Sequence, residues 1–263
     1  MHSDFSEFSY GYAVTEELAT QNKAKVVAAP RFPSLYEEGK KGGYDVKIPM
    51  VGKPVFLQFK LSDYLERRNA KEFRNGTMSA PYYRMHLRPA RHSDQHQLLL
   101  DLESSGESVF YIAPEFHLPA ELNQHYLGKR VVLNSAAFAP SAIGPLPDSD
   151  DHYIVFEKWK AFGFFCSDEP TRIAKTSLEG GLLMALHSRQ VQSRELGEAG
   201  LRQISDRMLK ILEAREPTKL TATSSRDLPG IRSIVSNRSV MEGLGYMCRT
   251  FFNTELVVLP SEL

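Results

Sequence analysis

Residues 43–60 read GYDVKIPMVGKPVFLQFK, and this stretch decides both the expected fold and the expected site. Two apolar runs, Val46–Ile48 and Val55–Lys60, flank a short turn that contains glycine and proline. This pattern is typical of two strands joined as a hairpin. The hairpin would bring Asp45, which opens the first strand, close to the polar end of the second strand.

The second strand ends in Gln58-Phe59-Lys60. Alternate residues of a strand point to the same side, so we expect Gln58 and Lys60 to share one face and Leu57 and Phe59 to face the core. A lysine on a largely apolar strand is costly to bury unless a negative charge compensates it. We expect Asp45 and an upstream glutamate to supply that charge.

The sequence leaves open which glutamate joins Asp45. Glu38 lies close before it, whereas Glu17 lies well upstream. Two carboxylates with backbone oxygen suit a hard cation such as Mg²⁺ or Mn²⁺. The metal could activate a water and offset charge on a phosphate, while Lys60 positions the nucleophile or stabilises the transition state. These residues outline a phosphodiesterase site.

Farther along the chain, strand-like runs alternate with helical or turn segments. Tyr82–Leu87 and Val109–Ala113 read as strands, and Gln95–Glu103 reads as a helix. A further helix is expected from Ser62 or Asp63 to about Arg74. The alternation predicts an α/β fold with a central sheet.

The character of the sequence changes near Asp148–Asp151. We therefore expect an α/β core over residues 1–150 and a mixed strand and helical region over residues 151–263 that could pack on the core. Within the second region, Ser177–Arg215 predicts one broken helix or two successive helices. The Ser, Thr and Arg content of Lys219–Asn237 predicts an exposed connection.

A final apolar strand is expected at Leu256–Leu259. The 263 residues carry 32 basic and 32 acidic side chains, so any binding of nucleic acid must come from a local patch. Two cysteines without metal-ligand spacing argue against a disulfide scaffold and a structural zinc site. Because no signal-peptide pattern or long apolar stretch is present, we expect a cytoplasmic protein.

The order Gly-Tyr-Asp45 followed by Gln58-x-Lys60 resembles the PD-(D/E)XK nuclease superfamily, in the Mrr-like variant where glutamine replaces the second acidic residue. The resemblance implies a restriction-endonuclease-like mixed central sheet flanked by helices, with a helical C-terminal extension. It implies that Asp45 is a metal ligand, that Gln58 takes the second acidic position, and that Lys60 is the catalytic lysine. The family also uses an acidic residue from a preceding helix, for which Glu17 and Glu38 both remain candidates.

This resemblance implies a magnesium-dependent endodeoxyribonuclease, of the kind found in bacterial restriction or phage defence. The alternative is a nuclease-like subunit that has lost activity and binds nucleic acid or a protein partner. DNA is the expected substrate, and RNA stays open. A homodimer or a partner protein of a defence system would fit such a role.

Four basic residues are candidates for binding nucleic acid. Arg67, Lys71 and Arg74 recur at i, i+4 and i+7 of the expected helix, although an ordinary solvated helix face is the simpler alternative. Arg84 could act with Tyr82 and Tyr83 through charge and stacking, although packing is the simpler role for such a strand.

Three histidines, His86, His92 and His96, fit no standard zinc spacing. Gln95 and His96 at a helix start could instead reach the face of the proposed site, because some nucleases of this superfamily place a glutamine on a following helix.

Overall fold

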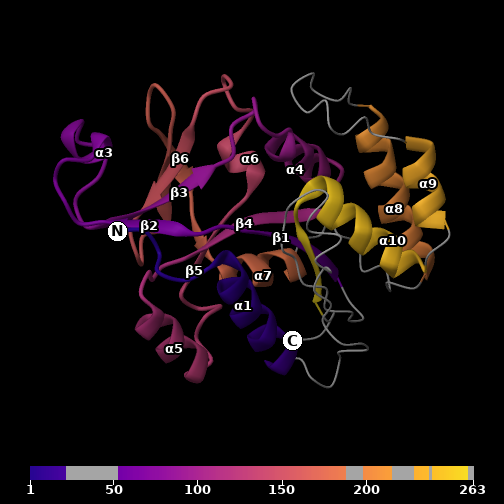
Figure 1. Cartoon of the computed structure of the whole chain (residues 1–263), viewed down its shortest axis with the longest axis horizontal. Coiled ribbons are helices and arrows are strands. Elements are labelled where there is room, and N and C mark those ends of the chain that lie inside the picture. The colour runs from indigo at the N-terminus through magenta and orange to yellow at the C-terminus, as the bar shows by residue number, and fades with distance from the viewer. Residues whose placement is uncertain (22–52, 188–197, 215–227, 237–238, 260–263) are drawn as a thin grey trace.

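The computed structural model describes residues 1–21, 53–187, 198–214, 228–236 and 239–259, which form two five-stranded sheets with helices around them (Figure 1). The first sheet is mixed, in the order β10-β1-β4-β5-β9, and the second is antiparallel, in the order β2-β3-β6-β7-β8. The predicted α/β class is confirmed. The strands are β1 (Lys53–Phe59), β2 (Ser62–Leu65), β3 (Tyr82–Leu87), β4 (Ser108–Pro114), β5 (Ser135–Phe138), β6 (His152–Phe156), β7 (Phe162–Cys166), β8 (Thr171–Ala174), β9 (Thr176–Ser177) and β10 (Glu255–Leu259).

Figure 1 shows α8, α9 and α10 gathered at one end of the molecule, opposite the short helix α3. α10 packs against both α8 and α9. The N-terminal residues lie along β2, where Tyr64 N donates to Met1 O at 2.8 Å. The helices are α1 (Glu7–Gln21), α3 (Lys71–Arg74), α4 (Gln95–Ser104), α5 (Pro119–Leu127), α6 (Pro140–Ile143), α7 (Leu178–His187), α8 (Glu198–Glu213), α9 (Leu228–Ser236), α10 (Val240–Met247) and the π-helix η3 (Cys248–Phe252).

β1 is an interior strand of the first sheet. It runs parallel to β4 on one edge and antiparallel to β10 on the other. Val55, Phe56 and Leu57 are fully buried, so neither face of the strand meets solvent there. A run of consecutive apolar residues is the usual sequence of a strand covered on both faces.

The expected strands at residues 55–60, 82–87, 109–113 and 256–259 are confirmed as β1, β3, β4 and β10. The expected helix at Gln95–Glu103 is α4, which ends before Gly106 at φ 98°, a left-handed conformation that favours glycine. In the described part of the segment Ser177–Arg215, the expected helical structure is confirmed by α7 and α8, on either side of residues 188–197. The expected strand Val46–Ile48 lies outside the described residues.

The helix expected from Ser62 or Asp63 to Arg74 is wrong. Residues 62–65 form β2, which pairs antiparallel with β3, and only Lys71–Arg74 is helical. Ser62 is fully buried, and its hydroxyl donates to Pro114 O at the end of β4. Pairing with β3, together with the Ser62 hydrogen bond to Pro114, gives this segment long-range hydrogen bonds that outweigh its local helix propensity.

The exposed connection expected over Lys219–Asn237 is wrong for residues 228–236, which form α9. Ile231 is buried, and Val235, one helical turn later, packs against the same core. An apolar pair one turn apart covers one stripe of a helix. The tertiary partner of that stripe is α10, which the local composition did not reveal.

The strands of residues 151–263 complete both sheets of the preceding region. β6 pairs with β3, and β10 pairs with β1. One continuous cluster of buried apolar side chains includes Leu57 of β1, Met208 of α8 and Leu256 of β10. The two expected regions therefore share a single core.

Candidate functional site

Gln58 lies inside the fold, at the junction of β1, α4 and the segment between η3 and β10. Its side chain is 1% exposed. Its Oε1 accepts hydrogen bonds from Gln95 Nε2 at 2.6 Å and from Asn253 Nδ2 at 3.3 Å, and its Nε2 donates to Phe59 O at 2.9 Å. Because buried amides are costly unless their polar atoms are bonded, this amide cluster of Gln58, Gln95 and Asn253 ties three distant segments together.

Gln95 reaches the face of Gln58, as expected, but His96 points elsewhere. The ring of His96 bonds the hydroxyl of Tyr111 at 2.9 Å and the carbonyl of Gly144 at 2.8 Å. Burial lowers the pKa of His96, so the ring is held neutral near pH 7. His96 therefore acts as a packing residue between α4 and β4.

Asn253 is a member of the amide cluster that the sequence reasoning missed. It adopts a left-handed conformation with φ 47° directly after η3. Its backbone oxygen also accepts a hydrogen bond from Gln95 Nε2 at 3.3 Å. An asparagine just after an apolar helical run was the available signal, because asparagine tolerates this conformation at helix ends.

Lys60 follows the last residue of β1, and its backbone N donates to Ile112 O at 2.9 Å. Its side chain is half-buried. The positive charge of Lys60 lowers the pKa of the Glu7 carboxyl, although burial raises the pKa of Glu7 by more. A carboxyl group from the first turn of α1 thus shares the electrostatic environment of Lys60.

Glu7 is the second residue that the sequence reasoning missed. An acidic residue in the first turn of a helix was the only signal, and it is ambiguous because carboxylates at this position also stabilise the helix dipole. The packing of α1 on β1 identifies its neighbourhood. The rings of Tyr10 and Phe59 meet edge to face with centroids 5.9 Å apart, one helical turn from Glu7 and one residue from Lys60.

Glu17 lies in a different environment on the same helix. Its side chain is buried, and Oε2 accepts hydrogen bonds from Val131 N at 2.7 Å and Val132 N at 3.4 Å. Burial raises the pKa of Glu17, and these two bonds oppose the rise. An α-helix rises 1.5 Å per residue, so Glu17 lies about 15 Å along the helix axis from Glu7. The two carboxyl groups cannot hold the same metal ion.

Asp45 and Glu38 lie outside the described residues, and their proximity to Lys60 stays a prediction. Both edges of β1 are paired with described strands, β10 along Lys53–Leu57 and β4 along Val55–Phe59. β10 therefore occupies over residues 53–57 the edge that the expected hairpin would have used. The described ranges contain no group of three or more His, Cys, Asp or Glu side chains that could hold a metal ion.

The expected basic helix stripe of Arg67, Lys71 and Arg74 does not form. Arg67 lies before α3, and the other two lie on that single turn, which stands apart at one edge of the molecule in Figure 1. All three side chains are exposed. Their role in binding nucleic acid stays a prediction, without the helical register that motivated it.

Arg84 is flanked by two carboxylates. Its guanidinium lies 3.9 Å from Asp63 and 3.8 Å from Glu72, and its Cζ lies 4.9 Å from the ring centroid of Tyr153. Tyr82 and Tyr83 are both buried, so their rings pack in the fold and do not face a ligand. The stacking role considered for these two tyrosines is wrong.

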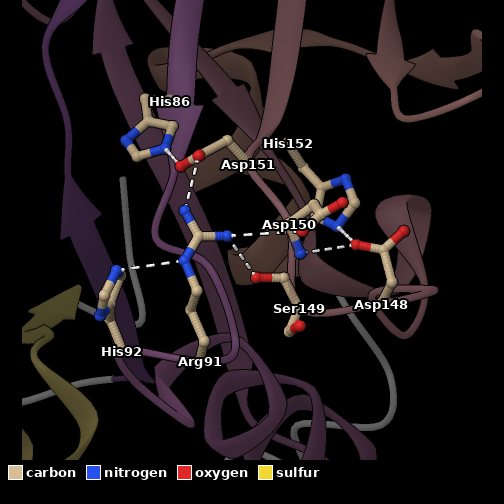
Figure 2. A network of polar contacts seen from close by, with 8 residues as sticks. All are labelled: His86, Arg91, His92, Asp148, Ser149, Asp150, Asp151 and His152. Carbon is tan, nitrogen blue, oxygen red and sulfur yellow. Dashed lines mark hydrogen bonds and ion pairs between the residues drawn. The ribbon is translucent and has the colours of Figure 1, made fainter.

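His86 and His92 belong to a polar network that holds the connection into β6 (Figure 2). Asp151 accepts a hydrogen bond from Arg91 Nη2 at 2.7 Å and lies 3.0 Å from His86 Nε2. Arg91 also donates to Ser149 O at 2.6 Å and to His92 Nε2 at 3.2 Å. The interactions of Asp151, led by the hydrogen bond from Arg91, lower the pKa of its carboxyl.

Comparison of this chain with models of known families, with curated proteins and with solved structures finds no match. Among the described residues, no helix combines the length and the apolar character needed to cross a membrane.

Proposed function

We propose that this chain is a metal-dependent endonuclease that hydrolyses DNA phosphodiester bonds on a restriction-endonuclease-like core. The observation that carries the proposal is the packing of α1 on the end of β1, where the rings of Tyr10 and Phe59 meet with centroids 5.9 Å apart, which brings the helix turn of Glu7 to the strand end of Lys60. A strand-end lysine and a first-helix carboxylate are two elements of the site that the resemblance implies. The role in restriction or phage defence and the cytoplasmic location are proposed from the same resemblance.

The order of elements supports this assignment. α1 precedes the Q-x-K strand β1, and β4 returns parallel to β1 after α4. Gln95, in the first turn of α4, donates a hydrogen bond to Gln58. A glutamine on a following helix accompanies the active-site strand in some PD-(D/E)XK nucleases.

In the proposal, the carboxylate ligands of a hard divalent cation are Glu7 and at least one residue of the segment 22–52. Carboxylate oxygens are the ligands that Mg²⁺ prefers, and Glu7 supplies one such group from the first turn of α1, which packs on the end of β1. We assign Asp45 as its partner, with Glu38 as a further candidate. A bound Mg²⁺ or Mn²⁺ would activate a water and offset charge on the scissile phosphate.

The residues of this chain have separate roles in the proposal. Lys60 holds a positive charge at the position where the phosphate gains negative charge in the transition state. Gln58 positions the end of β1, because its Oε1 already accepts hydrogen bonds from Gln95 and Asn253. Glu17 serves the fold through its bonds to the backbone of residues 131–132.

The test is incubation of purified protein with plasmid and linear DNA in Mg²⁺, Mn²⁺ or EDTA. Cleavage should require metal and should be abolished in Lys60→Ala, Glu7→Gln and Asp45→Ala. Glu16→Gln is the matched control on α1, because Glu16 pairs with Lys129 at 2.7 Å and should leave cleavage unchanged. Metal-dependent cutting that survives Lys60→Ala would refute the site.

A second candidate is a nuclease-like subunit without catalytic activity. The observation that favours this candidate is that Gln58 Oε1 already accepts hydrogen bonds from Gln95 and Asn253. Gln58 stands where the resemblance places the second acidic metal ligand, and its amide stabilises the fold instead. An inactive subunit should show no rise in melting temperature on addition of Mg²⁺ or Mn²⁺, because a ligand stabilises only the state that it binds. A metal-dependent rise that disappears in Asp45→Ala would instead support the nuclease.

A further inference from the structure

The connection between β6 and β7, residues 157–161, displays the sole tryptophan of the chain. Trp159 is 73% exposed and adopts a left-handed conformation with φ 65°. That conformation is unfavourable for a residue with a side chain, and an exposed indole loses the stabilisation that burial would give it. A single exposed apolar residue is normal on a protein surface, so a binding role for Trp159 depends on the residues around it.

The neighbours are aromatic rings and cations on the outer face of the second sheet. Lys158 Nζ lies 5.2 Å from the centroid of the Trp159 ring. Arg172 Cζ lies 3.9 Å from the ring centroid of Phe162, which meets Phe164 edge to face at 5.9 Å. We call Lys158, Trp159, Lys160, Phe162 and Arg172 the tryptophan surface.

The register of the strands places Phe162, Phe164 and Arg172 on one face. Phe164 pairs with Arg172, and directly paired residues of antiparallel strands point to the same side. The adjacent residues Phe165 and Ile173 are buried in the main core, so Phe162, Phe164 and Arg172 point away from it, and Phe164 packs against the small cluster of Met78, Tyr82, Val155 and Cys166. β8 has no further strand at its outer edge among the described residues, which leaves Arg172 exposed.

Trp159 is flanked in the chain by two lysines, Lys158 and Lys160. On α5, burial lowers the pKa of His125; the charges of Lys158 and Arg130 lower it further, and the charge of Glu121 raises it. The nearby Glu121 carboxylate caps α5 by accepting hydrogen bonds from His117 N and Leu118 N at 2.9 Å each.

The other carboxylates of these strands are Glu157, Asp168 and Glu169. Glu157 precedes Lys158, and its carbonyl oxygen accepts a hydrogen bond from Lys175 Nζ at 3.0 Å. Asp168 and Glu169 follow β7, about 13 Å along that strand from Phe162. Lys158 and Lys160 flank the exposed Trp159 in the chain, and Arg172 lies over the ring of Phe162, so three cations accompany the rings of this surface.

We propose that the tryptophan surface binds a single-stranded segment of nucleic acid, with an unpaired base stacked on Trp159 and the neighbouring phosphates held by Lys158, Lys160 and Arg172. Flat exposed rings interleaved with cations are how proteins bind single strands without reading sequence. A base inside a duplex is stacked on both faces, so the indole selects frayed ends, flaps or gaps. The choice of nucleic acid as ligand rests on the proposed nuclease function.

Ring contacts connect α5 with the residues that precede α1. The ring of His125, beside Lys158, lies 4.9 Å from the ring of Phe116, which follows β4. Phe116 in turn lies 5.6 Å from Phe5, two residues before Glu7. Phe116 is fully buried, so these contacts connect α5 with the N-terminal residues through the core.

The experiment uses the full chain in EDTA, where no metal-dependent cleavage occurs. Because Trp159 is the sole tryptophan, its emission reports stacking directly. A short oligothymidylate should quench the emission, and the corresponding duplex should quench it far less. In parallel, fluorescence anisotropy of a dye-labelled oligothymidylate should show Trp159→Phe binding like the wild type and Trp159→Ala weakened on the order of tenfold.

Controls separate stacking from general loss of apolar surface or of fold. Met184→Ala removes another exposed apolar side chain, on α7, and should leave affinity unchanged. Lys160→Ala should make binding less dependent on salt, with the slope reduced by about 0.7 for each phosphate that the variant no longer neutralises. An oligouridylate of the same length shows whether the sugar matters, and equal binding assigns single strands of either kind as the ligand.

Unchanged tryptophan emission on addition of oligothymidylate, or equal affinity of Trp159→Ala and wild type, would overturn the inference. Its failure is distinct from failure of the proposed function, because cleavage in Mg²⁺ is measured separately. Quenching by a protein that never cuts DNA supports the surface and refutes the nuclease. Cleavage of DNA without quenching of the Trp159 emission supports the nuclease and refutes binding at the tryptophan surface.

Discussion

Gln95 Nε2 donates a hydrogen bond to Gln58 Oε1 at 2.6 Å, joining the first turn of α4 to the end of β1 across 37 residues of chain. Asn253 Nδ2 approaches the same oxygen from the C-terminal end of the chain at 3.3 Å. Gln58, the first residue of the expected Q-x-K pair, is therefore part of the interior. Only Lys60, beyond the end of the strand, remains partly accessible.

Replacing Gln95 with alanine should lower the free energy of unfolding by about 1–3 kcal/mol, because Gln58 Oε1 loses its shortest hydrogen bond while it stays buried. Urea unfolding followed by circular dichroism measures the change. Gln97→Ala is the matched control on the same helix, because Gln97 Nε2 bonds the carboxylate of Asp101 at 3.1 Å in a part-buried position. Equal losses in the two variants would mean that the amide cluster contributes no special stability.

The ion pair between Glu115 and Lys175 is buried, with both side chains at most 5% exposed. Glu115→Gln should lower the free energy of unfolding by about 3–5 kcal/mol, because it leaves the Lys175 charge buried without its partner. Adding Lys175→Met in the same chain should recover a large part of that loss, since the double variant buries no charge. Additive losses in a double-mutant cycle measured by urea unfolding would contradict this account.

Glu7 gives the stability a specific dependence on pH. Burial raises the pKa of Glu7 in the folded state, so the folded chain binds this proton more tightly than the unfolded chain does. Its contribution to stability is therefore largest at low pH and falls as pH rises from the ordinary value of 4.5 through the folded pKa. Glu7→Gln should match the wild type below pH 4.5 and become relatively more stable at neutral pH.

Glu16→Gln should show the opposite trend, because the hydrogen bond from Lys129 lowers the pKa of Glu16. The stability that Glu16 contributes is present above pH 4.5 and is lost as the pH falls through the pKa of Glu16 in the folded state. Thermal unfolding of both variants at a series of pH values measures the two trends. Parallel curves for Glu7→Gln and wild type at all pH values would show that Glu7 is not buried as described.

The network in Figure 2 predicts a local effect of Arg91. Arg91→Ala removes the hydrogen bonds to Ser149 O and to the Asp151 carboxylate, so amide exchange over residues 148–151 should accelerate. Hydrogen-exchange mass spectrometry measures the exchange rate of this segment directly. Arg88→Ala, an exposed neighbour in sequence, should leave exchange in that segment at the wild-type rate.

Several elements could be predicted because their signals are local. The apolar run at Val55–Phe59 and the capped helix at Gln95 are determined by side-chain pattern and turn residues within a few positions. The same reasoning failed for residues 62–74, where a helix-compatible sequence is drawn into β2 by pairing with β3. It also missed α9, whose apolar stripe acquires a partner only when α10 packs beside it.

The sequence by itself determined the α/β class of the fold and the position of the strand that carries Gln58 and ends before Lys60, because these follow from short-range periodicity and turn residues. The tertiary structure alone decided that β10 pairs with β1, that Asn253 bonds Gln58, and that Glu7 rather than Glu17 lies within the field of Lys60. Each of these interactions joins residues far apart in the chain. Their energy depends on burial and on long-range closure of the fold, which no local pattern encodes.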